Sequence, residues 1–489
     1  MTKELKRCSQ FTAGLAAQQK GLHQQAINHY QSALTEGDRR PQVWLNLAVA
    51  FANTKRFDAA ELLYRRILKQ DPNNASAWTN YGNLLCKQQL FEQAERAHRK
   101  ALALQPNDVL CLYNAGNVPF HSNQPRAALN FFNEVLKRQP QHHGARWNRA
   151  LALLQLEQWQ PGFAGYEVRL EQHQNLVKPI NRINPPKDSY WQGQSLDGQR
   201  LLLTTEQGYG DVIQFARYCV ALKQRFDVHI TVQVRPALKR LMACCPAVDE
   251  VITRQEALSA EAPSAEALSA EAPPAYDYYF PLLSLARMVE TKQKLLPITA
   301  YLQAPSDALL SSAIKRQIAR IKQTKKIKIG LNWQGKLSPY DRGCPLNQLA
   351  PLLIDERFEF FSLQQGREQD LVDSGLDGFI HNLGQDVHDF ADTAALMQAL
   401  DLVISIDSAP AHLAGALNKP CLVMLLKYND WRWHLARNDS PWYPKMRLYR
   451  QKNQGEWASV VAQITRELGH FADRNMDFNS FFATTRNTQ

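Results

Sequence analysis

The chain is 489 residues long, with 45% hydrophobic and 21% charged residues, a composition typical of globular proteins rather than of disordered or fibrous chains. At roughly 150 residues per domain, this length predicts about three domains. Lysine and arginine (57) exceed aspartate and glutamate (46), which gives a net charge of +11. The basic residues are dispersed and surround no nucleic-acid motif, so we expect no nucleic-acid partner.

The apolar residues and the cysteines exclude further classes of protein. Purely apolar runs reach only six residues, as at 421–426, whereas a membrane-spanning helix needs about 20. The N-terminus lacks the apolar stretch of a secretory signal. None of the eight cysteines forms a C-x-x-C pair or a Cys/His cluster with zinc spacing. We therefore expect a cytoplasmic protein with no integral membrane segment, no disulfide framework and no metal.

The first third of the chain repeats with a period of 34 residues. Alanine recurs at positions where two helices of a hairpin approach closely, an aromatic residue fills the next layer, and proline ends the second helix. This pattern is typical of tetratricopeptide repeats, whose stacked hairpins form a superhelix with a concave groove that binds protein segments. We expect a degenerate first repeat and three full ones over 11–140, and a capping pair of helices over 144–170. The recurring residues are Ala26, Ala60, Ala94 and Ala128; Tyr30, Tyr64 and Phe132; Pro72, Pro106 and Pro140.

Asparagine recurs with the same period on the first helix of each hairpin, at Asn46, Asn80, Asn114 and Asn148. An amide both donates and accepts hydrogen bonds, so a ladder of asparagines along the groove can hold the backbone of an extended peptide. The alternative is that these asparagines only hold neighbouring helices together. The sequence leaves both interpretations open.

From residue 200 onwards, short apolar runs alternate with amphipathic stretches, which indicates β-α-β units and parallel sheets. The expected strands form two groups, separated by a helix-rich connection around 304–325. Two doubly wound sheets that face each other would leave a cleft at the carboxyl ends of their strands, where ligands bind. The expected strands are 200–205, 228–234 and 277–280 in the first group, and 326–333, 358–363, 401–406 and 420–426 in the second.

The expected fold class is therefore multidomain, with an N-terminal all-α tetratricopeptide superhelix followed by two Rossmann-like α/β domains that face a cleft. We place the superhelix at 1–170, the first α/β half at 171–310, the second at 311–475 and a tail at 476–489. Residues 255–275 hold a tandem decapeptide of Ala, Glu, Pro and Ser. Such low-complexity sequence packs no core, so we expect a surface insertion there.

The segment EQGYGDVIQFARY, residues 206–218, follows an expected strand and opens a helix. Gly208 and Gly210 permit a tight turn and the close approach of another group, and the helix start behind them favours anions. Asp211 and Glu206 then lie at the mouth of the cleft, where a carboxylate can act as general base on an acceptor hydroxyl. The alternative is that Asp211 only caps the helix.

The segment 401–420 combines a buried strand with the start of a helix near Pro410. Asp407 and Ser408 lie at the end of this strand. Backbone N–H groups and the Ser408 hydroxyl at that point make a site for phosphate or diphosphate. His412 in the first turn can hydrogen-bond a phosphate, although a lone histidine is more often structural.

Two loops at the start of the second half carry further candidates. LNWQGK, residues 331–336, contains Trp333, Gln334 and Lys336, and DRGCP, residues 341–345, contains Arg342. Lys336 and Arg342 can neutralise a leaving diphosphate, or they can be solvated surface charges.

The segment 428–444, YNDWRWHLARNDSPWYP, is rich in aromatic residues. Its tryptophans and tyrosine can stack on a base or a sugar, or pack in the interior. The sequence contains no D-x-D motif, no Walker A motif and no G-x-S-x-G motif. These absences disfavour a transferase with a carboxylate-held metal, an ATPase and a hydrolase.

Five blocks in order carry a family resemblance: EQGYGDVIQFARY, IGLNWQG, FFSLQ, DFADTAALMQALDLVISIDSAPAHLAGALNKP and DWRWHLARNDSPWYPKMRLYRQ. Together they resemble bacterial tetratricopeptide-repeat proteins with a glycosyltransferase domain. That domain is similar to the lipopolysaccharide heptosyltransferases, and the layout resembles the O-linked N-acetylglucosamine transferases. The likeness extends over roughly 11–470.

The resemblance implies a GT-B fold, metal-independent inverting transfer, and a nucleotide-sugar donor held mainly by the C-terminal half. The aspartate proposed as the base in the heptosyltransferases matches Asp211. Their donor diphosphate lies on the helix start that matches Ser408, Ala409 and His412. This chain departs from the relatives in two places: Ser408-Ala409 replaces Thr-Gly, and KLSPYDR lacks the histidine that often precedes the aspartate-arginine pair.

Some proteins of this layout are associated with flagellin glycosylation. The leading hypothesis is therefore a glycosyltransferase that moves a sugar from a nucleotide-sugar to a Ser or Thr hydroxyl of a protein, such as flagellin, recruited by the repeat groove. The alternatives are a non-catalytic adaptor with a vestigial or sugar-nucleotide-sensing transferase fold, and a transferase for lipopolysaccharide or another glycan. A homodimer remains open. Besides the catalytic pair Asp211 and Glu206, the expected donor-binding residues are Ser408, Ala409, His412, Asp407, Lys336, Arg342, Trp333 and Gln334.

Overall fold

The computed structural model describes residues 3–172, 189–253, 275–289, 300–337, 341–474 and 477–483. The chain folds as two compact units, Met1–Leu156 and Glu157–Gln489. The boundary expected at residue 170 thus falls inside the second unit. Of the expected insertion at 255–275 only the last residue is described, and of the expected tail at 476–489 only 477–483.

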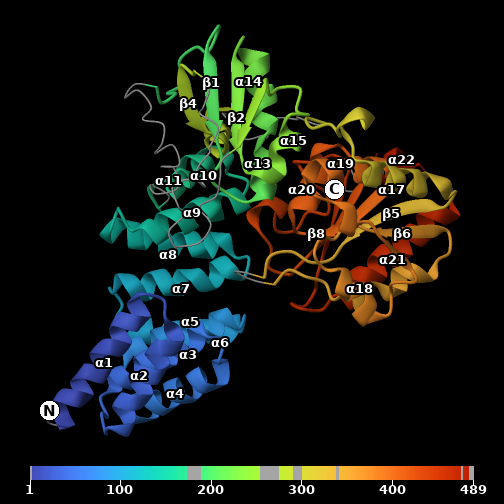
Figure 1. Cartoon of the computed structure of the whole chain (residues 1–489). Helices are drawn as coiled ribbons and strands as arrows, with labels where there is room; N and C mark the ends of the chain where they lie inside the picture. The colour runs from blue at the N-terminus through green and yellow to red at the C-terminus, as the bar shows by residue number, and fades with distance from the viewer. Residues whose placement is uncertain are drawn as a thin grey trace. The chain divides into compact units, whose positions relative to one another are not determined.

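The first unit is helical throughout its described residues (Figure 1). Its helices pair as successive hairpins, and each hairpin packs on the next. The recurring alanines at 26, 60, 94 and 128 are fully buried, because no larger side chain fits where the two helices of a hairpin meet. The helices are α1 (Lys3–Gln19), α2 (His23–Thr35), α3 (Pro41–Asn53), α4 (Phe57–Gln70), α5 (Ala75–Lys87), α6 (Phe91–Leu104), α7 (Val109–His121), α8 (Pro125–Arg138) and α9 (His143–Gln155).

Each hairpin turns through one residue in the left-handed region, and these residues also recur every 34 positions. They are Gly21, Lys55, Gln89 and Asn123, with φ between 58° and 74°. The two backbone hydrogen bonds of a Schellman motif close the turn after α5: Gln89 N–H donates to Cys86 O at 3.0 Å, and the next N–H donates to the carbonyl of residue 85 at 2.9 Å. The turns therefore fix the hairpin geometry that the 34-residue period predicts.

The first part of the second unit contains a sheet of four parallel strands in the order β3-β2-β1-β4. Leu201 of β1 is aligned with Ile230 of β2 and with Tyr278 of β4. The strand β3 was not predicted, because four residues are too few to show an alternating pattern. The strands are β1 (Arg200–Thr204), β2 (His229–Val234), β3 (Glu250–Thr253) and β4 (Tyr278–Pro281); the helices are α10 (Trp159–Tyr166), α11 (Arg169–Gln172), α13 (Tyr209–Phe215), α14 (Arg217–Arg225), α15 (Lys239–Met242) and α16 (Leu285–Val289).

The second part contains a sheet of six parallel strands in the order β10-β9-β8-β5-β6-β7. The central strand β8 is fully buried, which is why its sequence LVISI reads as a continuous apolar run. The strands are β5 (Ile327–Asn332), β6 (Phe358–Ser362), β7 (Ile380–Asn382), β8 (Leu402–Ile406), β9 (Cys421–Leu425) and β10 (Met446–Arg450); the helices are α17 (Ser312–Gln323), α18 (Glu368–Ser374), α19 (Phe390–Ala399), α20 (Ala409–Ala416), α21 (Ala458–Asp473) and α22 (Phe478–Ala483).

The two sheets of the second unit are consistent with the expected GT-B fold. The chain leaves β1 into α13 and leaves β8 into α20, and these two helices contact each other. The carboxyl ends of β1 and β8 therefore both adjoin the contact between α13 and α20. Ligands of open α/β sheets bind at the carboxyl ends of the strands.

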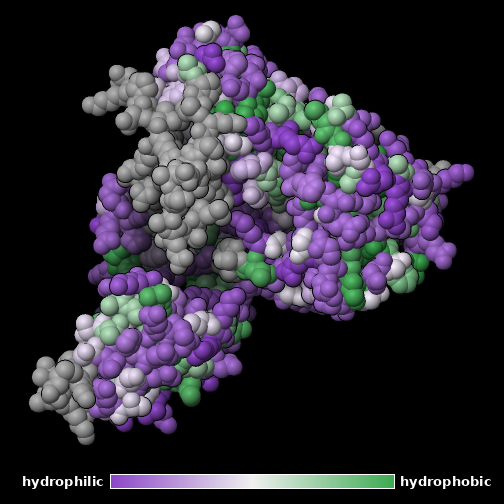
Figure 2. Space-filling model, in the orientation of Figure 1, coloured by the Kyte–Doolittle hydropathy of each residue, from purple (hydrophilic) through white to green (hydrophobic). Residues whose placement is uncertain are grey.

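The face of the molecule drawn in Figure 2 is mainly hydrophilic, with apolar residues in small groups. Large apolar side chains that are exposed include Ile354 (79%), Leu62 (69%) and Phe379 (63%). Scattered apolar side chains are ordinary on protein surfaces and assign no function by themselves.

Candidate functional site

Asp211 lies in the first turn of α13 and uses both carboxylate oxygens. Its Oδ2 accepts a hydrogen bond from the Gly208 N–H at 2.9 Å, so the residue does cap the helix. Its Oδ1 lies 2.6 Å from Nη2 of Arg432, and its side chain is 23% exposed. The carboxylate thus has a structural role and also stays accessible from solvent.

Gly210 permits the close approach of α13 and α20. A Cβ at this position would lie 2.9 Å from Cδ2 of His412 and 3.4 Å from Cα of Ala409. The first approach is too close for a Cβ, so a side chain here would force the buried His412 ring to move, whereas the second is an ordinary van der Waals contact. The structure therefore brings Gly210 and Asp211 of the first half next to Ala409 and His412 of the second.

Of the backbone N–H groups and the serine hydroxyl predicted at the start of α20, one N–H group is unbonded among the described residues, and the hydroxyl bonds within the protein. Ser408 Oγ donates to Asn332 Oδ1 at 2.8 Å and makes no cap hydrogen bond to the helix. Pro410 has no N–H, and the Ala411 N–H donates to Ser408 O at 3.1 Å. The Ala409 N–H has no partner within the described ranges and lies at the positive end of the helix dipole.

His412 is buried and held in place by its neighbours. Its Nδ1 lies 3.0 Å from the Tyr443 hydroxyl, and its ring stacks on Trp433 with 5.0 Å between ring centroids. Burial lowers the pKa of His412 to about 3, so the imidazole is neutral at neutral pH. It can hydrogen-bond a phosphate but cannot supply a positive charge to one.

Arg342 and Asp407 form an ion pair beside this helix start, with 2.7 Å between Nη1 and Oδ2. Asp407 is nearly buried, whereas Arg342 is 31% exposed. The pKa of Arg342 is raised by Asp407 first, and also by Asp430 and Asp211. Arg342 therefore carries its charge close to the candidate base and keeps N–H groups that other described residues do not occupy.

Three other predicted residues form no hydrogen bond or ion pair with this cluster in the described ranges. The Trp333 ring is buried in the core of the second half and donates to Asp370 Oδ2 at 3.1 Å. Gln334 bonds to Asp341 and its N–H to Gln364. Lys336 is exposed and contacts none of the other candidates in the part of the chain that is described. The departure in KLSPYDR involves residues 338–340, which are outside the described residues.

Glu206 is tied to a different partner from that of Asp211. Its Oε1 lies 2.8 Å from Nε of Arg169, and the two side chains are 4% and 1% exposed. Nη2 of Arg169 also donates to Ser284 Oγ at 2.6 Å. Burial raises the pKa of Glu206, and Arg169 opposes this. The buried ion pair indicates that Glu206 fastens α11 to the first sheet.

Arg432 contacts Asp211, and no local pattern in the sequence marks it as a site residue. Its nitrogens lie 2.6 Å from Asp211 Oδ1, 2.9 Å from Asp430 Oδ1 and 2.8 Å from Gln214 Oε1. Of the two interpretations of the aromatic residues in 428–444, the structure shows packing in the interior: Trp431, Trp433, Trp442 and Tyr443 are each at most 3% exposed.

Two of the four repeat asparagines make side-chain hydrogen bonds within the first unit. Asn114 donates to the carbonyl four residues earlier in α7 at 2.9 Å, and Asn148 donates to Asn117 Oδ1 at 2.9 Å. The Asn148 bond joins α9 to α7, which agrees with the interpretation that the asparagines hold neighbouring helices together, whereas the Asn114 bond stays within α7. Asn46 and Asn80 are partly buried and make no side-chain hydrogen bond to other described residues. Peptide binding by the four remains a prediction.

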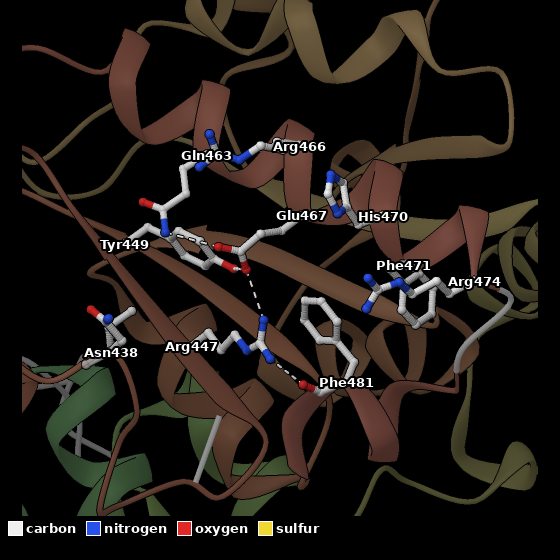
Figure 3. Close-up of a pocket in the computed structure, with 11 residues that line it drawn as sticks. Asn438, Arg447, Tyr449, Gln463, Arg466, Glu467, His470, Phe471, Arg474 and Phe481 are labelled. Carbon is white, nitrogen blue, oxygen red and sulfur yellow. Dashed lines mark hydrogen bonds and ion pairs between the residues drawn. The ribbon is translucent and has the colours of Figure 1, made fainter. Parts of the chain in front are cut away.

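A separate pocket of about 320 Å³ lies between α21, β10 and α22 (Figure 3). Several of its polar groups pair with one another: Arg447 pairs with Glu467 at 2.9 Å, and the Tyr449 hydroxyl donates to the same carboxylate at 2.7 Å. Nε of Arg447 has no hydrogen-bond partner among the described residues. Two cations along its rim, Arg466 of α21 and Arg474 just after this helix, are exposed. We attribute the pocket to the packing of α22 rather than to a ligand.

The described part of the chain contains neither a candidate metal site nor a candidate membrane-spanning helix. No group of three His, Cys, Asp or Glu side chains there is arranged to hold a metal ion. None of the helices found there is long and apolar enough to span a membrane.

Models of known families match both units. The tetratricopeptide repeat model matches residues 11–75, and that of the cilia and flagella-associated protein 70 middle TPR-like domain matches 44–160. The glycosyltransferase family 9 (heptosyltransferase) model matches 386–457, which includes Asp407, α20 and Arg432. The first unit thus carries tetratricopeptide repeats, and the second contains a family 9 glycosyltransferase domain.

Individual proteins are more distant. Protein FlbA of Caulobacter vibrioides is 24% identical over 394 residues, which are 71% of this chain and 64% of FlbA. The chain therefore spans less than two thirds of that relative. Among solved structures, pilF of Pseudomonas aeruginosa is 23% identical with a TM-score of 0.31 over 37% of this chain and 83% of that chain. The TPR protein TTC0263 of Thermus thermophilus is 16% identical with a TM-score of 0.33 over 36% and 96%.

Proposed function

We propose that this chain, a tetratricopeptide-repeat protein with a glycosyltransferase family 9 domain, transfers a sugar from a nucleotide-sugar to a Ser or Thr hydroxyl of a protein. The observation that carries the proposal is the meeting of α13 and α20. It places an accessible carboxylate, Asp211, beside a helix start where the Ala409 N–H has no partner among the described residues. A base for the acceptor and an anion site for the donor are thus side by side.

The donor side consists of the start of α20 and the Arg342 guanidinium. The helix dipole and the Ala409 N–H favour the diphosphate, and Arg342 supplies positive charge that the neutral His412 cannot. No metal is needed in this scheme, because these groups neutralise the leaving diphosphate. Family 9 membership supports a nucleotide-sugar as the donor.

The chemistry is a direct displacement. Asp211 takes the proton from the acceptor hydroxyl while the hydroxyl oxygen attacks C1 of the sugar. The bond from C1 to the diphosphate breaks, and the nucleoside diphosphate leaves with the electron pair. Attack from the side opposite to the leaving group inverts the configuration at C1. The helix start and Arg342 stabilise the charge that develops on the diphosphate.

The acceptor in this proposal is a protein segment bound by the repeats, and flagellin is the first one to test. Tetratricopeptide repeats bind protein segments, and partly buried Asn46 and Asn80 keep their amides available within the described structure. A transferase for a glycan acceptor would leave the repeats to recruit other proteins.

The test is calorimetric binding of nucleoside diphosphates and nucleotide-sugars to Ala409→Asp. An aspartate at the first position of α20 suits the helix start, but its charge lies where the diphosphate would bind. We expect wild type to bind one nucleotide, with a stabilisation of about 2.7 kcal/mol at 100 times its Kd. We expect Ala409→Asp to lose this binding while it melts cooperatively.

Ala458→Asp is the matched control, since it makes the same change at the first residue of α21. Arg342→Gln is a second variant, at a more exposed position, and should weaken binding without a loss of folding. If folded wild type binds no member of the panel, the proposal fails and the adaptor function gains support. Equal binding by wild type and Ala409→Asp would move the donor site away from α20.

A further inference from the structure

Arg432 joins the two halves of the second unit. Its side chain is 9% exposed, and each of its three nitrogens lies within hydrogen-bond distance of an acceptor. Nη2 donates to Asp211 Oδ1 at 2.6 Å and Nε to Gln214 Oε1 at 2.8 Å, both from α13 in the first half. Nη1 donates to Asp430 Oδ1 at 2.9 Å, within its own loop. One planar group thus connects the candidate base to the half that carries α20.

Only an arginine can make this set of contacts. The guanidinium presents its donors in a fixed fork, whereas a lysine places one compact charge on a flexible stem. The two aspartates compensate the buried charge, which would otherwise be costly. The ring of Trp431 lies 4.3 Å from Cζ and supports the same plane. The orientation of the guanidinium, and with it that of the Asp211 carboxylate, is therefore fixed.

The loop that carries Arg432 is held in a strained conformation. His434, just after the short helix at Trp431–Trp433, has φ 58° and ψ −176°, a region that residues other than glycine rarely adopt and that costs of the order of 1–3 kcal/mol. Asn429 Nδ2 and Arg450 Nη2 donate to its carbonyl at 2.8 and 3.2 Å. Such strain persists where surrounding contacts impose it, and it is concentrated at functional sites.

Arg342 is available to a ligand, in contrast to Arg432. Arg342 has one carboxylate partner and is 31% exposed, whereas Arg432 has all three nitrogens engaged by the protein. A diphosphate would meet an Arg432 guanidinium that is only 9% exposed and already bonded to Asp211, Asp430 and Gln214, whereas the Arg342 guanidinium is more accessible. The role that the contacts give to Arg432 is therefore exerted through Asp211.

We infer that Arg432 is the positioning residue for the catalytic carboxylate: it orients Asp211 of the first half towards the helix start of the second. The Gly208 N–H holds Oδ2 and Arg432 holds Oδ1, and each oxygen keeps a further lone pair for the acceptor hydroxyl. A carboxylate held at two points loses little freedom before it takes the proton, and small misplacements reduce turnover strongly. The inference rests on the proposed function, in which Asp211 is the base.

The experiment compares Arg432→Lys with Arg217→Lys in the full chain. Arg217 is also fully buried and also joins the two halves, through Nη1 to the carbonyl of Trp442 at 3.1 Å. Each variant is made in wild type and in Asp211→Asn. The readouts are the melting temperature, nucleotide binding, and kcat and KM for release of nucleoside diphosphate from the nucleotide-sugar that wild type turns over.

We expect Arg432→Lys to lower kcat by about tenfold or more while KM for the donor changes by less than about twofold. In Asp211→Asn the same change should alter the residual kcat by less than about twofold, because its effect acts through the missing carboxylate. Arg217→Lys should lower the melting temperature but change kcat by less than about threefold.

Three results would overturn the inference while the proposed function stands. The first is a wild-type kcat in Arg432→Lys, and the second is the same loss from Arg432→Lys whether or not Asp211 is present. Equal losses of kcat in the Arg432 and Arg217 variants would make Arg432 merely structural and have the same consequence. Wild type that neither binds nor turns over any nucleotide-sugar would instead overturn the proposed function, and this inference with it.

Discussion

One buried histidine shows how much a single residue matters at a repeated position. His98 occupies the place that Tyr30, Tyr64 and Phe132 occupy in the other hairpins, at the same 34-residue spacing. It is 2% exposed, and neither ring nitrogen has a hydrogen-bond partner among the residues that the structure describes. Gly82 makes room for it, since a Cβ there would lie 2.5 Å from Nε2. Burial lowers the pKa of His98 to about 4.

This histidine should make the first unit sensitive to acid. The unfolded chain takes up a proton on His98 near pH 6.5, whereas the folded chain does so only near pH 4. The stability that the neutral ring allows is thus present above pH 6.5 and is lost as the pH falls towards 4, by about 3 kcal/mol in all. We expect His98→Phe to stabilise the first unit by about 1 kcal/mol at pH 7.5, and by about 2 kcal/mol more at pH 5.

Urea unfolding at the two pH values measures this difference. Tyr64→Phe is the control, because it changes the equivalent residue of the neighbouring hairpin without a group that titrates in this range. Its effect should be the same at both pH values. An effect of His98→Phe that does not grow on acidification would mean that the ring accepts a proton in the folded protein.

Residues whose role depends on their neighbours in sequence were easier to predict than residues whose role depends on contacts distant in sequence. The glycines before α13 and the proline of α20 mark a turn and a helix start, so the sequence places Gly210, Asp211 and Ala409 near a site. The partner of Asp211 is Arg432, 221 positions away, and nothing local marks that pairing. Glu206 is also a carboxylate and therefore a candidate base by residue type. It pairs with Arg169, a contact that only the fold reveals.

At the scale of the element, the hairpin turns contain residues that are not optimal for their conformation. Gln89 has φ 61° and Asn123 has φ 58°, although side chains other than glycine disfavour this region. We expect Gln89→Gly to stabilise the first unit by about 0.5 kcal/mol, because the lost strain exceeds the extra entropy of glycine in the unfolded chain. Chemical denaturation monitored by circular dichroism measures the change.

Asn123→Gly is the matched control for this turn. Asparagine tolerates the left-handed region better, and Asn123 Oδ1 accepts a hydrogen bond from Gln155 Nε2 at 3.2 Å. Its replacement by glycine should bring no gain. If Asn123→Gly stabilises the protein as much as Gln89→Gly, the hydrogen bond contributes nothing and the strain alone sets the effect.

The helices and strands could be predicted from sequence periodicity wherever the pattern was repeated often enough. Alanines that recur at one spacing determine the repeats, and all seven expected strands are present. The strands that were not predicted, β3, β7 and β10, are short or interrupted by charged residues: β10 reads MRLYR, whose arginines pair with Glu467 and with backbone carbonyls. A strand that contains charged residues lacks a clear hydrophobic pattern, and the groups that pair with these charges cannot be identified when they are remote in sequence.

At the scale of the whole molecule, the two units have separate hydrophobic cores. One core is built from the helices of the first unit, around Tyr30 and Tyr64, and another from the second sheet with α21, around Leu402 and Ile464. The proposed ligand site lies in the second unit only, and His98 lies in the first only. A change confined to one core should therefore act on the unfolding of that unit.

Differential scanning calorimetry of the full chain should resolve two transitions with different responses. The nucleoside diphosphate that binds wild type should raise only the transition of the second unit, because a ligand stabilises the unit that holds its site by RT ln(1 + [L]/Kd). His98→Phe at pH 5 should raise only the other. Combined, the two changes should add, since sites without shared partners contribute independently. A single transition that responds to both would show instead that the repeats and the transferase domain unfold as one cooperative block, so that binding to one unit would stabilise the other.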